Sequence, residues 1–371
     1  MAADRGPPRY FSPAGTESGS APAADCGLCP HRCRIPPGGS GRCGVRQNRD
    51  GRGAIPFYGL ITAMAADPIE KKPLYHFRPG SSILSLGFAG CNLRCPFCQN
   101  WRISQGTAAA SGGRRFSPAE VIDAARNGGF RQIAYTYSEP LVHAEFLLDC
   151  MKLAREAGIA NVLVSNGCVN GEPAADLLAL TDAANIDLKA FSEETYSRVL
   201  GGDLSAVLSF IKAARAAGVH LEITTLLVPG LNDGAEELEK CAAFIAGLSP
   251  GIPWHLSACH PDYRWDVPPT DSAFLIGAAR RARETLSYVY AGNIAGWTDA
   301  PELYDTACPA CGMTLVRRRG SRINTEGLAV KETEGGQAYY CARCGEAAPI
   351  VNTTSGISGT GAMRKTNAVG N

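Results

Sequence analysis

The sequence has no apolar run that approaches the length of a membrane span. Its first residues also lack the basic start and the apolar stretch of a secretory signal. Residues 1–24 are rich in alanine, proline, glycine and serine, which predicts a disordered leader, and residues 351–371 predict a disordered tail in the same way. From these absences we expect a cytoplasmic protein without a membrane anchor.

Neither sign of charge is in excess. The 371 residues include 36 Lys and Arg against 35 Asp and Glu, so the formal net charge is +1. A near-neutral chain has little electrostatic attraction for a phosphate backbone. Basic residues are also not interleaved with aromatic ones, as they are on surfaces that bind nucleic acid. Binding of nucleic acid is therefore not expected.

Cysteine, by contrast, is abundant, with 15 residues. In a chain without an export signal, so many cysteines predict ligation of metals or clusters in a reducing compartment, not disulfides. Most fall into three groups, near the N-terminus, in a central loop and near the C-terminus. Of the others, Cys150, Cys168 and Cys241 are expected to be buried apolar fillers, and Cys259 lies near the rim of the expected active site.

The middle of the chain alternates strand and helix patterns. Ser117, Pro118 and Glu120 form a capping box with proline at the first helical position, which predicts a helix through Asn127. Buried-type strands with helical crossovers predict an α/β protein with a parallel sheet. Since no glycine-rich dinucleotide-binding turn is present, a partial or full β/α barrel is favoured. The expected strands are residues 83–86, 133–137, 162–164, 184–188, 221–228, 254–256 and 288–291, and further helices are expected from Pro140 to Gly158, over 204–217 and over 235–248.

Three central cysteines carry the most specific signal. Cys91, Cys95 and Cys98 supply three thiolates from one loop in the spacing C-x3-C-x2-C. A structural zinc site or a fully ligated iron–sulfur cluster takes four protein ligands. Three thiolates without a fourth nearby indicate a cubane with one iron left open for a small molecule. The alternative is a zinc loop that a distant histidine or cysteine completes.

This spacing, with Phe97 before the last cysteine, resembles the signature of the radical SAM superfamily. Residues 67–80, 90–101 and 185–189 further resemble the radical SAM component of the AmmeMemoRadiSam system, a group similar to the activating enzymes of glycyl radical enzymes such as pyruvate formate-lyase. By motif order, the resemblance covers residues 25–350. It implies a partial (β/α)6 barrel over residues 57–300 with its cluster loop after the first strand, between a cysteine-rich module at 25–56 and another at 301–350.

The resemblance also implies site residues. Cys91, Cys95 and Cys98 would hold a [4Fe–4S] cluster whose open iron chelates S-adenosylmethionine (SAM), and reduction would release a 5′-deoxyadenosyl radical. Glu139 would hold the SAM ammonium, although this chain has Tyr137-Ser138 where the family has two glycines. The other implied SAM contacts are Asn166 at the carboxylate or sulfonium, Asp187 and Lys189 at the ribose and carboxylate, and Phe97 and Asn293 at the adenine. For Asp187 and Lys189, a salt-bridged strand end is the alternative.

Three histidines are candidates for contact with the substrate. His255 lies on an expected strand and His260 follows that strand. An imidazole is able to transfer protons near neutral pH. His76 lies in the segment before the first strand and would line the entrance. A packed interior position is the alternative for each of them.

Two outer cysteine groups predict further metal sites. Cys308, Cys311, Cys341 and Cys344 form two C-x2-C knuckles, each followed by glycine, which suits a structural zinc ribbon, with rubredoxin-type iron as the alternative. Near the N-terminus, Cys26, Cys29, Cys33 and Cys43 predict a zinc site or an auxiliary iron–sulfur cluster, with His31 as an alternative ligand. Zinc is favoured, because a short module without a core of its own needs a stabilising ion.

These patterns favour an oxidoreductase that cleaves SAM and abstracts hydrogen from a substrate, either a partner protein or a small molecule. A flavodoxin or ferredoxin-type reductant is expected, and the resemblance implies Memo-like and AMME-syndrome-type partner proteins. The alternatives are a radical SAM enzyme that modifies RNA and a non-catalytic scaffold with several zinc sites. Charged and amide residues at the ends of successive expected strands count against the scaffold.

Overall fold

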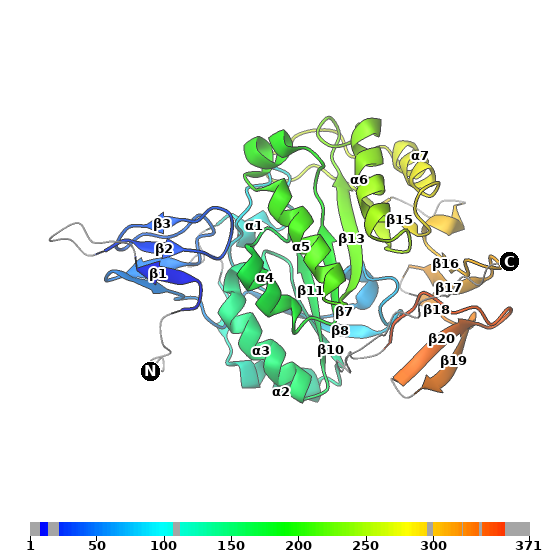
Figure 1. Ribbon diagram of the computed structural model, residues 1–371, viewed down its shortest axis with the longest axis horizontal. Helices are drawn as coiled ribbons and strands as arrows, with labels where there is room; N and C mark the ends of the chain where they lie inside the picture. The colour runs from blue at the N-terminus through cyan, green and yellow to red at the C-terminus, as the bar shows by residue number, and fades with distance from the viewer. Residues whose placement is uncertain are drawn as a thin grey trace, which may run out of the picture.

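The computed structural model describes residues 8–13, 22–106, 112–294, 300–320, 322–333 and 336–352. Its centre is an eight-stranded sheet in the order β15-β14-β13-β12-β11-β10-β8-β7. The strands from β8 to β15 are parallel to their neighbours, whereas β7 pairs with β8 in the antiparallel sense. Helices cover the outer face of this curved sheet (Figure 1). The predicted α/β class with a parallel, barrel-like sheet is confirmed.

The bounds of the elements are as follows. The central strands are β7 Ala63–Pro68, β8 Ser82–Gly87, β10 Gln132–Thr136, β11 Ala160–Ser165, β12 Ala183–Asp187, β13 His220–Leu227, β14 Trp254–Ala258 and β15 Val289–Gly292. The α-helices are α1 Trp101–Ser104, α2 Pro118–Asn127, α3 Ala144–Glu156, α4 Gly171–Leu178, α5 Leu204–Ala216, α6 Ala235–Leu248 and α7 Ser272–Ala282. Short helical turns are η1 Ile69–Lys71, η2 Pro140–His143, η3 Thr195–Leu200 and η4 Pro301–Leu303. The outer strands are β1 Phe11–Pro13, β2 Ala24–Cys26, β3 Arg34–Ile35, β4 Gln47–Arg49, β5 Arg52–Ala54, β6 Leu60–Ile61, β9 Arg114–Arg115, β16 Thr306–Ala307, β17 Thr314–Arg319, β18 Arg322–Asn324, β19 Leu328–Thr333 and β20 Gly336–Cys341.

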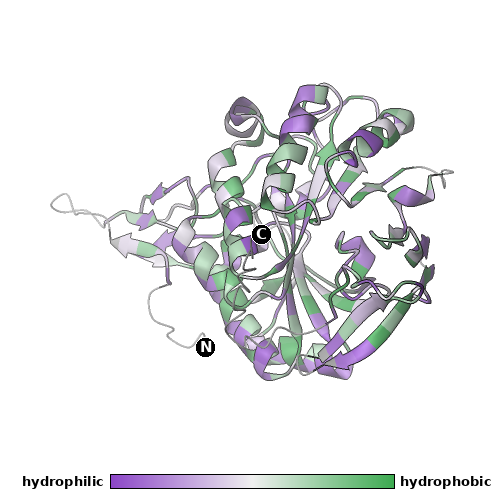
Figure 2. Ribbon diagram, turned by 45° about the vertical axis from the view of Figure 1, so that its right-hand side comes forward, coloured by the Kyte–Doolittle hydropathy of each residue, from purple (hydrophilic) through white to green (hydrophobic). Residues whose placement is uncertain are grey.

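Local sequence signals account for the helices around the sheet. At α2 the capping box forms as predicted, because the Glu120 amide donates to Ser117 Oγ at 3.2 Å and the Ser117 amide donates to Glu120 Oε2 at 2.7 Å. Such caps contribute about 1 kcal/mol each. Helices α5 and α6 also form where they were predicted. Figure 2 shows hydrophobic stretches along the central strands and hydrophilic stretches on the helices that cover them.

The segment before β8 closes the amino-terminal end of the barrel. Ile69, Leu74 and Phe77 are fully buried and pack into a cluster with early residues of four strands. We call this the floor cluster; its strand members are Ile83, Ala134, Ala160, Val162 and Ala183. Burying each large apolar side chain contributes about 1.5–3 kcal/mol. The floor cluster therefore leaves the carboxyl end of the sheet as the open end.

A buried polar network lies beside the floor cluster. The carboxylate of Glu222, on β13, is fully buried and accepts the backbone amides of Tyr75 and His76 at 2.9 and 2.7 Å. It also accepts His220 Nε2 at 2.9 Å and His255 Nε2 at 2.7 Å. Burial raises the pKa of Glu222, but the bonds and charges of the two histidines outweigh this and hold the pKa well below its usual range. We call these five residues the Glu222 network.

The C-terminal module packs against the segment before β8. Arg318, on β17, is buried, its guanidinium lies 4.1 Å from the centre of the Tyr75 ring, and its Nη2 donates to the Tyr75 carbonyl at 2.6 Å. Its Nη1 donates to Thr306 Oγ1 at 2.9 Å, and this hydroxyl lies 2.9 Å from the Tyr290 hydroxyl on β15. The ribbon of β16 to β20 is thus fastened to the barrel.

The ends of the chain differ in part from the prediction. Phe11–Pro13, within the predicted leader, forms β1 and pairs with β2, with Phe11 opposite Cys26. Tyr10 also donates its hydroxyl to Asp176 at 2.8 Å. At the other end, Val351 pairs with Phe77. These described residues are ordered because they gain long-range partners, and the rest of the predicted leader and tail lies outside the described residues. Within the described residues, each helix is too short or too polar to cross a bilayer.

Candidate functional site

The three central cysteines lie on a loop at the carboxyl end of the sheet, directly after β8. Gly90 opens the loop with φ +84°, and a Cβ there would lie 2.5 Å from the Cys43 carbonyl oxygen, so glycine is required. The Leu93 amide donates to Cys91 Sγ at 3.3 Å, and Ser104 Oγ lies 3.1 Å from Cys98 Sγ. These contacts fix the thiols at the open end of the barrel.

The thiol set fits a cluster better than a single ion. One loop supplies three soft sulfur ligands, and Cys95 among them is buried. Among the described residues, only the C-terminal cysteines bring three or more candidate ligand atoms within 4.8 Å of one another. The central thiols are therefore spread more widely than the sulfurs around one tetrahedral ion. This spread and the missing fourth thiolate suit a [4Fe–4S] cluster with one open iron.

Glu139 lies at the end of β10 and is almost fully buried, with 1% of its surface exposed. Its Oε1 accepts Ser165 Oγ at 2.7 Å and the Leu141 amide at 3.0 Å, while its Oε2 accepts the Asn166 amide at 2.8 Å. Burial raises the pKa of Glu139 to about 7 despite these bonds. The carboxylate thus ties the end of β10 to the end of β11, beside the cluster loop.

Tyr137 stands at the first of the two positions where the resemblance predicts glycine, and its backbone conformation is one that glycine adopts readily. Its φ is +72°, in the left-handed region that costs a residue with a side chain about 1–2 kcal/mol. Two side-chain contacts offset this cost. The Tyr137 hydroxyl donates to Asp67 Oδ2 at 2.6 Å, and Lys72 Nζ lies 4.4 Å from the ring centre. Ser138, the second replacement, donates its hydroxyl to the Phe88 carbonyl at 2.6 Å.

Asn166 and Asn92 connect the end of β11 to the cluster loop. Asn166 Nδ2 donates to Asn92 Oδ1 at 3.0 Å and lies 3.7 Å from Cys91 Sγ. Asn92 Nδ2 in turn donates to the Cys168 carbonyl at 2.6 Å. Asn92 was not predicted as a site residue. Its only signal was its place next to Cys91 in the motif.

Asp187 and Lys189 form an ion pair at the end of β12, with 3.0 Å between Lys189 Nζ and Asp187 Oδ2. Burial lowers the pKa of Lys189, but Asp187 and the neighbouring Cys95 sulfur outweigh this and raise it. The backbone of this segment is held by Asn232, whose Nδ2 donates to the Lys189 carbonyl at 2.6 Å. The pair therefore lies next to a predicted cluster ligand, and Asn232 is a further supporting residue that was not predicted.

Aromatic side chains close the rim over the cluster loop. Phe97 is buried and meets Trp265 edge to face, with 6.2 Å between ring centres. The Arg264 amide donates to the Pro96 carbonyl at 2.9 Å, and Trp101 stacks on Tyr263. The segment after β14 is thus pinned onto the cluster loop.

The remaining predicted residues lie either after β14 and β15 or in the Glu222 network. Asn293 follows β15 with φ +58°, and its Nδ2 donates to the Ala258 carbonyl at 3.4 Å. His260 is exposed on the segment after β14. His255 belongs to the Glu222 network, and His76 Nε2 lies 2.6 Å from the Tyr290 hydroxyl. Burial lowers the pKa of His76 to about 3. A substrate role for these histidines stays a prediction, and His76 and His255 have partners within the protein.

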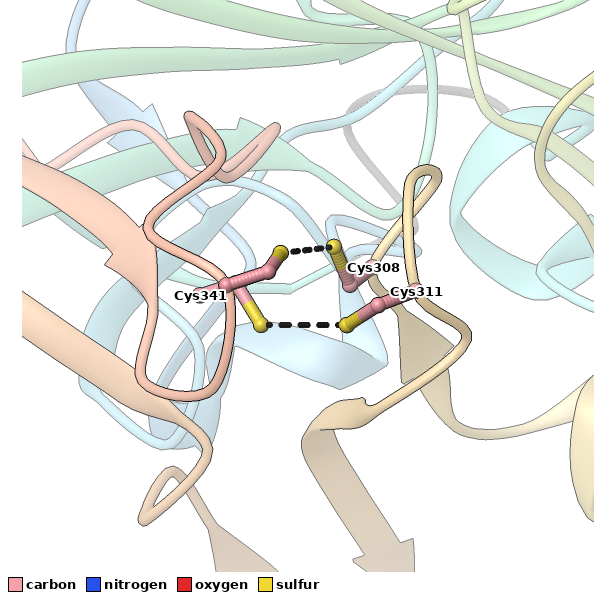
Figure 3. Close-up of side chains that lie close together, drawn as sticks. Cys308, Cys311 and Cys341 are labelled. Atoms are coloured by element: carbon pink, nitrogen blue, oxygen red, sulfur yellow. Dashed lines mark hydrogen bonds between the residues drawn. The ribbon is translucent and has the colours of Figure 1, made fainter.

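The C-terminal cysteines form a compact four-sulfur cluster. Cys308 Sγ lies 3.6 Å from Cys344 Sγ, and Cys311 Sγ lies 3.6 Å from Cys341 Sγ (Figure 3). A tetrahedral ion with metal–sulfur bonds of about 2.3 Å needs sulfurs about 3.8 Å apart. Gly312 and Gly345 adopt φ +70° and +74°, which permits both knuckle turns. The set fits one tetrahedral metal ion.

Replacing Cys311 with alanine is expected to unfold the ribbon and leave the barrel folded. The ribbon's own apolar cluster is small, so a bound ion would supply much of its stability. Limited proteolysis and metal analysis check this. We expect cleavage after residue 300 and loss of one metal ion per chain. A ribbon that keeps its protease resistance without metal would contradict the prediction.

Comparison with known proteins identifies the family. The model of the Radical SAM superfamily matches residues 86–245. An uncharacterized protein of Methanocaldococcus jannaschii is 39% identical over 330 residues, which cover 88% of this chain and 95% of that protein. The chain belongs to the radical SAM superfamily. Family membership implies an enzyme that uses SAM and a [4Fe–4S] cluster, which favours the cluster over the zinc loop at the central cysteines.

Activating enzymes are among the further relatives. The pyruvate formate-lyase-activating enzyme of Clostridium pasteurianum is 29% identical over 169 residues, which cover 43% of this chain and 68% of that enzyme. Among solved structures, a domain of the pyruvate formate-lyase-activating enzyme from Bacteroides vulgatus has 21% identity and a TM-score of 0.36, and it covers 43% of this chain and 98% of that chain. The sequence relative from Clostridium pasteurianum confirms the predicted similarity to activating enzymes over part of the chain.

Proposed function

We propose that this enzyme cleaves SAM reductively and abstracts a hydrogen atom from a substrate, in the manner of a glycyl-radical-activating enzyme. The observation that carries the proposal is the position of Cys91, Cys95 and Cys98 among the polar ends of successive strands. When bound, the [4Fe–4S] cluster and SAM supply the radical chemistry. The rest of the site binds SAM, orients it and keeps water away.

Glu139 is suited to receive the SAM ammonium. Its carboxylate is buried next to the cluster loop, and a carboxylate has lone pairs beyond the three bonds that it already accepts. A bound ammonium would favour the charged form of a group whose pKa is about 7 when the site holds no cation. Asn166, with its amide near Cys91, would face the SAM carboxylate or sulfonium.

Asp187 and Lys189 would hold the ribose and carboxylate, while Phe97 and Asn293 would border the adenine. The packing of Trp265 on Phe97 would shield part of the loop from water, and exclusion of water protects a reactive intermediate from side reactions. His260, exposed after β14, remains a proposed substrate residue. His76 and His255 were proposed for the same role, but both are buried in the Glu222 network beside the closed end of the barrel, which favours the packed alternative for them.

We further propose the finer assignments. The activating enzymes among the relatives support a protein substrate and a flavodoxin or ferredoxin-type reductant. The motifs at residues 67–80 and 185–189 support the AmmeMemoRadiSam system, with Memo-like and AMME-syndrome-type partners. The compact C-terminal cysteines support zinc. Oxidoreductase chemistry, a cytoplasmic location and modules at 25–56, 57–300 and 301–350 complete the proposal.

The test is anaerobic reconstitution with iron and sulfide, followed by addition of dithionite and SAM. We expect 5′-deoxyadenosine and methionine as products. Zinc in place of iron at the central cysteines, with no SAM binding, would contradict the proposal and favour the scaffold. If reduction in the presence of SAM perturbs the cluster's EPR signal but yields no product, adding candidate partner proteins tests for a substrate requirement.

A further inference from the structure

The four N-terminal cysteines are surrounded by N–H donors. Arg46 Nε donates to Cys26 Sγ at 3.2 Å, and the Arg42 amide donates to Cys33 Sγ at 3.4 Å. Backbone amides also bond the other two sulfurs, that of His31 at Cys29 and those of Val45 and Arg46 at Cys43. A thiol in an apolar interior does not require such donors, whereas a thiolate bound to metal does.

The Arg46 side chain, which donates to Cys26, is itself held in place by other contacts. It is buried, with 1% of its surface exposed, and it forms a two-bond ion pair with Glu145 of α3 at 2.8 and 3.0 Å. An arginine that is fixed in this way directs its remaining Nε–H at the Cys26 sulfur. The four sulfurs therefore lie in a polar environment suited to metal binding, and Arg46 connects one of them to α3 of the barrel.

The spacing of these sulfurs differs from that of the C-terminal set. In the part of the chain that the structure describes, no three of Cys26, Cys29, Cys33 and Cys43 bring their sulfurs within 4.8 Å of one another, whereas all four C-terminal sulfurs meet that limit. One zinc ion requires the closer spacing. An iron–sulfur cluster separates its thiolates more widely, because several irons lie between them. The N-terminal sulfurs thus share the open spacing of the central cysteines.

We propose that the N-terminal module binds a second iron–sulfur cluster, with Cys26, Cys29, Cys33 and Cys43 as its ligands, and that this cluster passes electrons to the radical SAM cluster. The first half of the proposal stands on the N-terminal residues alone. The second half rests on the proposed function.

A continuous path joins the two ligand sets. The Arg42 amide bonds Cys33 Sγ, and the Arg42 carbonyl accepts the Arg94 guanidinium. Arg94 Nη1 then donates to the Cys91 carbonyl at 2.8 Å. A second contact runs from His31 Nε2 to the Asn92 carbonyl, 2.8 Å apart. The side chains of Arg94 and His31 therefore link the backbone next to one ligand set with the backbone next to the other.

The electron transfer balances as a one-electron relay. A reduced low-potential flavoprotein or iron–sulfur protein loses one electron, and the N-terminal cluster gains it. The N-terminal cluster then returns to its oxidised form as the central cluster is reduced. No proton and no bond is exchanged in these two steps.

Metal analysis of a variant without the central ligands tests the first half. The full-length Cys91→Ala, Cys95→Ala, Cys98→Ala variant is reconstituted anaerobically with iron and sulfide, and its iron, sulfide, zinc and low-temperature EPR spectrum after dithionite are measured. We expect retained iron and sulfide with a reduced-cluster signal. Loss of all iron, with more than one zinc ion per chain, would overturn the proposal. The N-terminal cysteines are unaltered in this variant, so the result reports on them directly.

Two further variants assign the remaining metal. Adding Cys29→Ser to the triple variant is expected to remove the iron and leave zinc unchanged. Adding Cys311→Ser instead is expected to remove zinc and leave iron unchanged. A matched control is Cys241→Ser, because Cys241 is a buried cysteine on α6 outside all three groups. Iron that survives Cys29→Ser would contradict the ligand assignment.

The relay is tested in the chain with intact central ligands. For Cys29→Ser, we expect the ratio of 5′-deoxyadenosine formed with a reduced flavodoxin to that formed with dithionite to fall to background. An unchanged ratio would overturn the relay while leaving the second cluster in place. If the unsubstituted enzyme with dithionite gives neither product nor a cluster EPR signal that responds to SAM, the proposed function fails instead, and the metal analysis remains valid.

Discussion

Replacing Cys95 with alanine is expected to abolish SAM cleavage. Cys95 is buried in the central loop, beside Lys189 and Cys98. Removing its sulfur leaves two thiolates in the loop, too few to hold a cubane by three irons. The expected result is no detectable 5′-deoxyadenosine with dithionite and SAM, together with loss of the central cluster's EPR signal.

The control for this loss is Cys150→Ala, since Cys150 is fully buried on α3 and belongs to none of the three cysteine groups. It shortens a buried side chain in the same way without touching the loop. We expect this control to retain cleavage, and we expect Cys95→Ala to retain the metal of the C-terminal ribbon. Full cleavage activity in Cys95→Ala would show that the central assignment is wrong.

Replacing Glu222 with alanine is expected to lower the free energy of unfolding by about 3–5 kcal/mol, the range for breaking a buried charge network. The carboxylate accepts four donors, from Tyr75, His76, His220 and His255. Alanine would leave two backbone amides and two imidazoles buried without their partner. Urea denaturation monitored by circular dichroism measures the change.

The matched control is Glu239→Ala. Glu239 forms an ion pair with Arg281 in which both side chains are more than half exposed, and such pairs contribute about 0–1 kcal/mol. A small effect at Glu239 beside a large one at Glu222 would show that burial of the network decides the result. A loss below about 1 kcal/mol at Glu222 would contradict its structural role.

The central sheet was predictable because its strands carry their own signal. All seven predicted apolar runs form strands, and α2 ends at Asn127 as its capping box and length predicted. These elements are encoded by local apolar periodicity and caps. The helices α1, α4 and α7 and the edge strand β7 were not predicted. The sequence of β7, Ala-Met-Ala-Ala-Asp-Pro, has weak strand propensity, and its pairing with β8 makes it a strand.

The candidate site was predictable only where a motif marked it. The spacing of the central cysteines is read directly from the chain, and the resemblance, together with their place at the ends of expected strands, singled out Glu139 and Asn166. Asn92 and Asn232 were not predicted, because their role lies in hydrogen bonds to distant segments, such as that of Asn92 to the Cys168 carbonyl. His76 and His255 were named as candidates for substrate contact, but both are bonded to other residues of the protein, and the sequence does not reveal these bonds.

The fastening of Arg318 to Tyr75 has a consequence for biosynthesis. The two residues are 243 positions apart, so the segment that closes the barrel leaves the ribosome long before the arginine that holds it. Closing so long a loop costs conformational entropy before its contacts can form, and contacts of this kind slow folding. In the nascent chain, Tyr75 therefore stays without its arginine until the ribbon has been translated and folded.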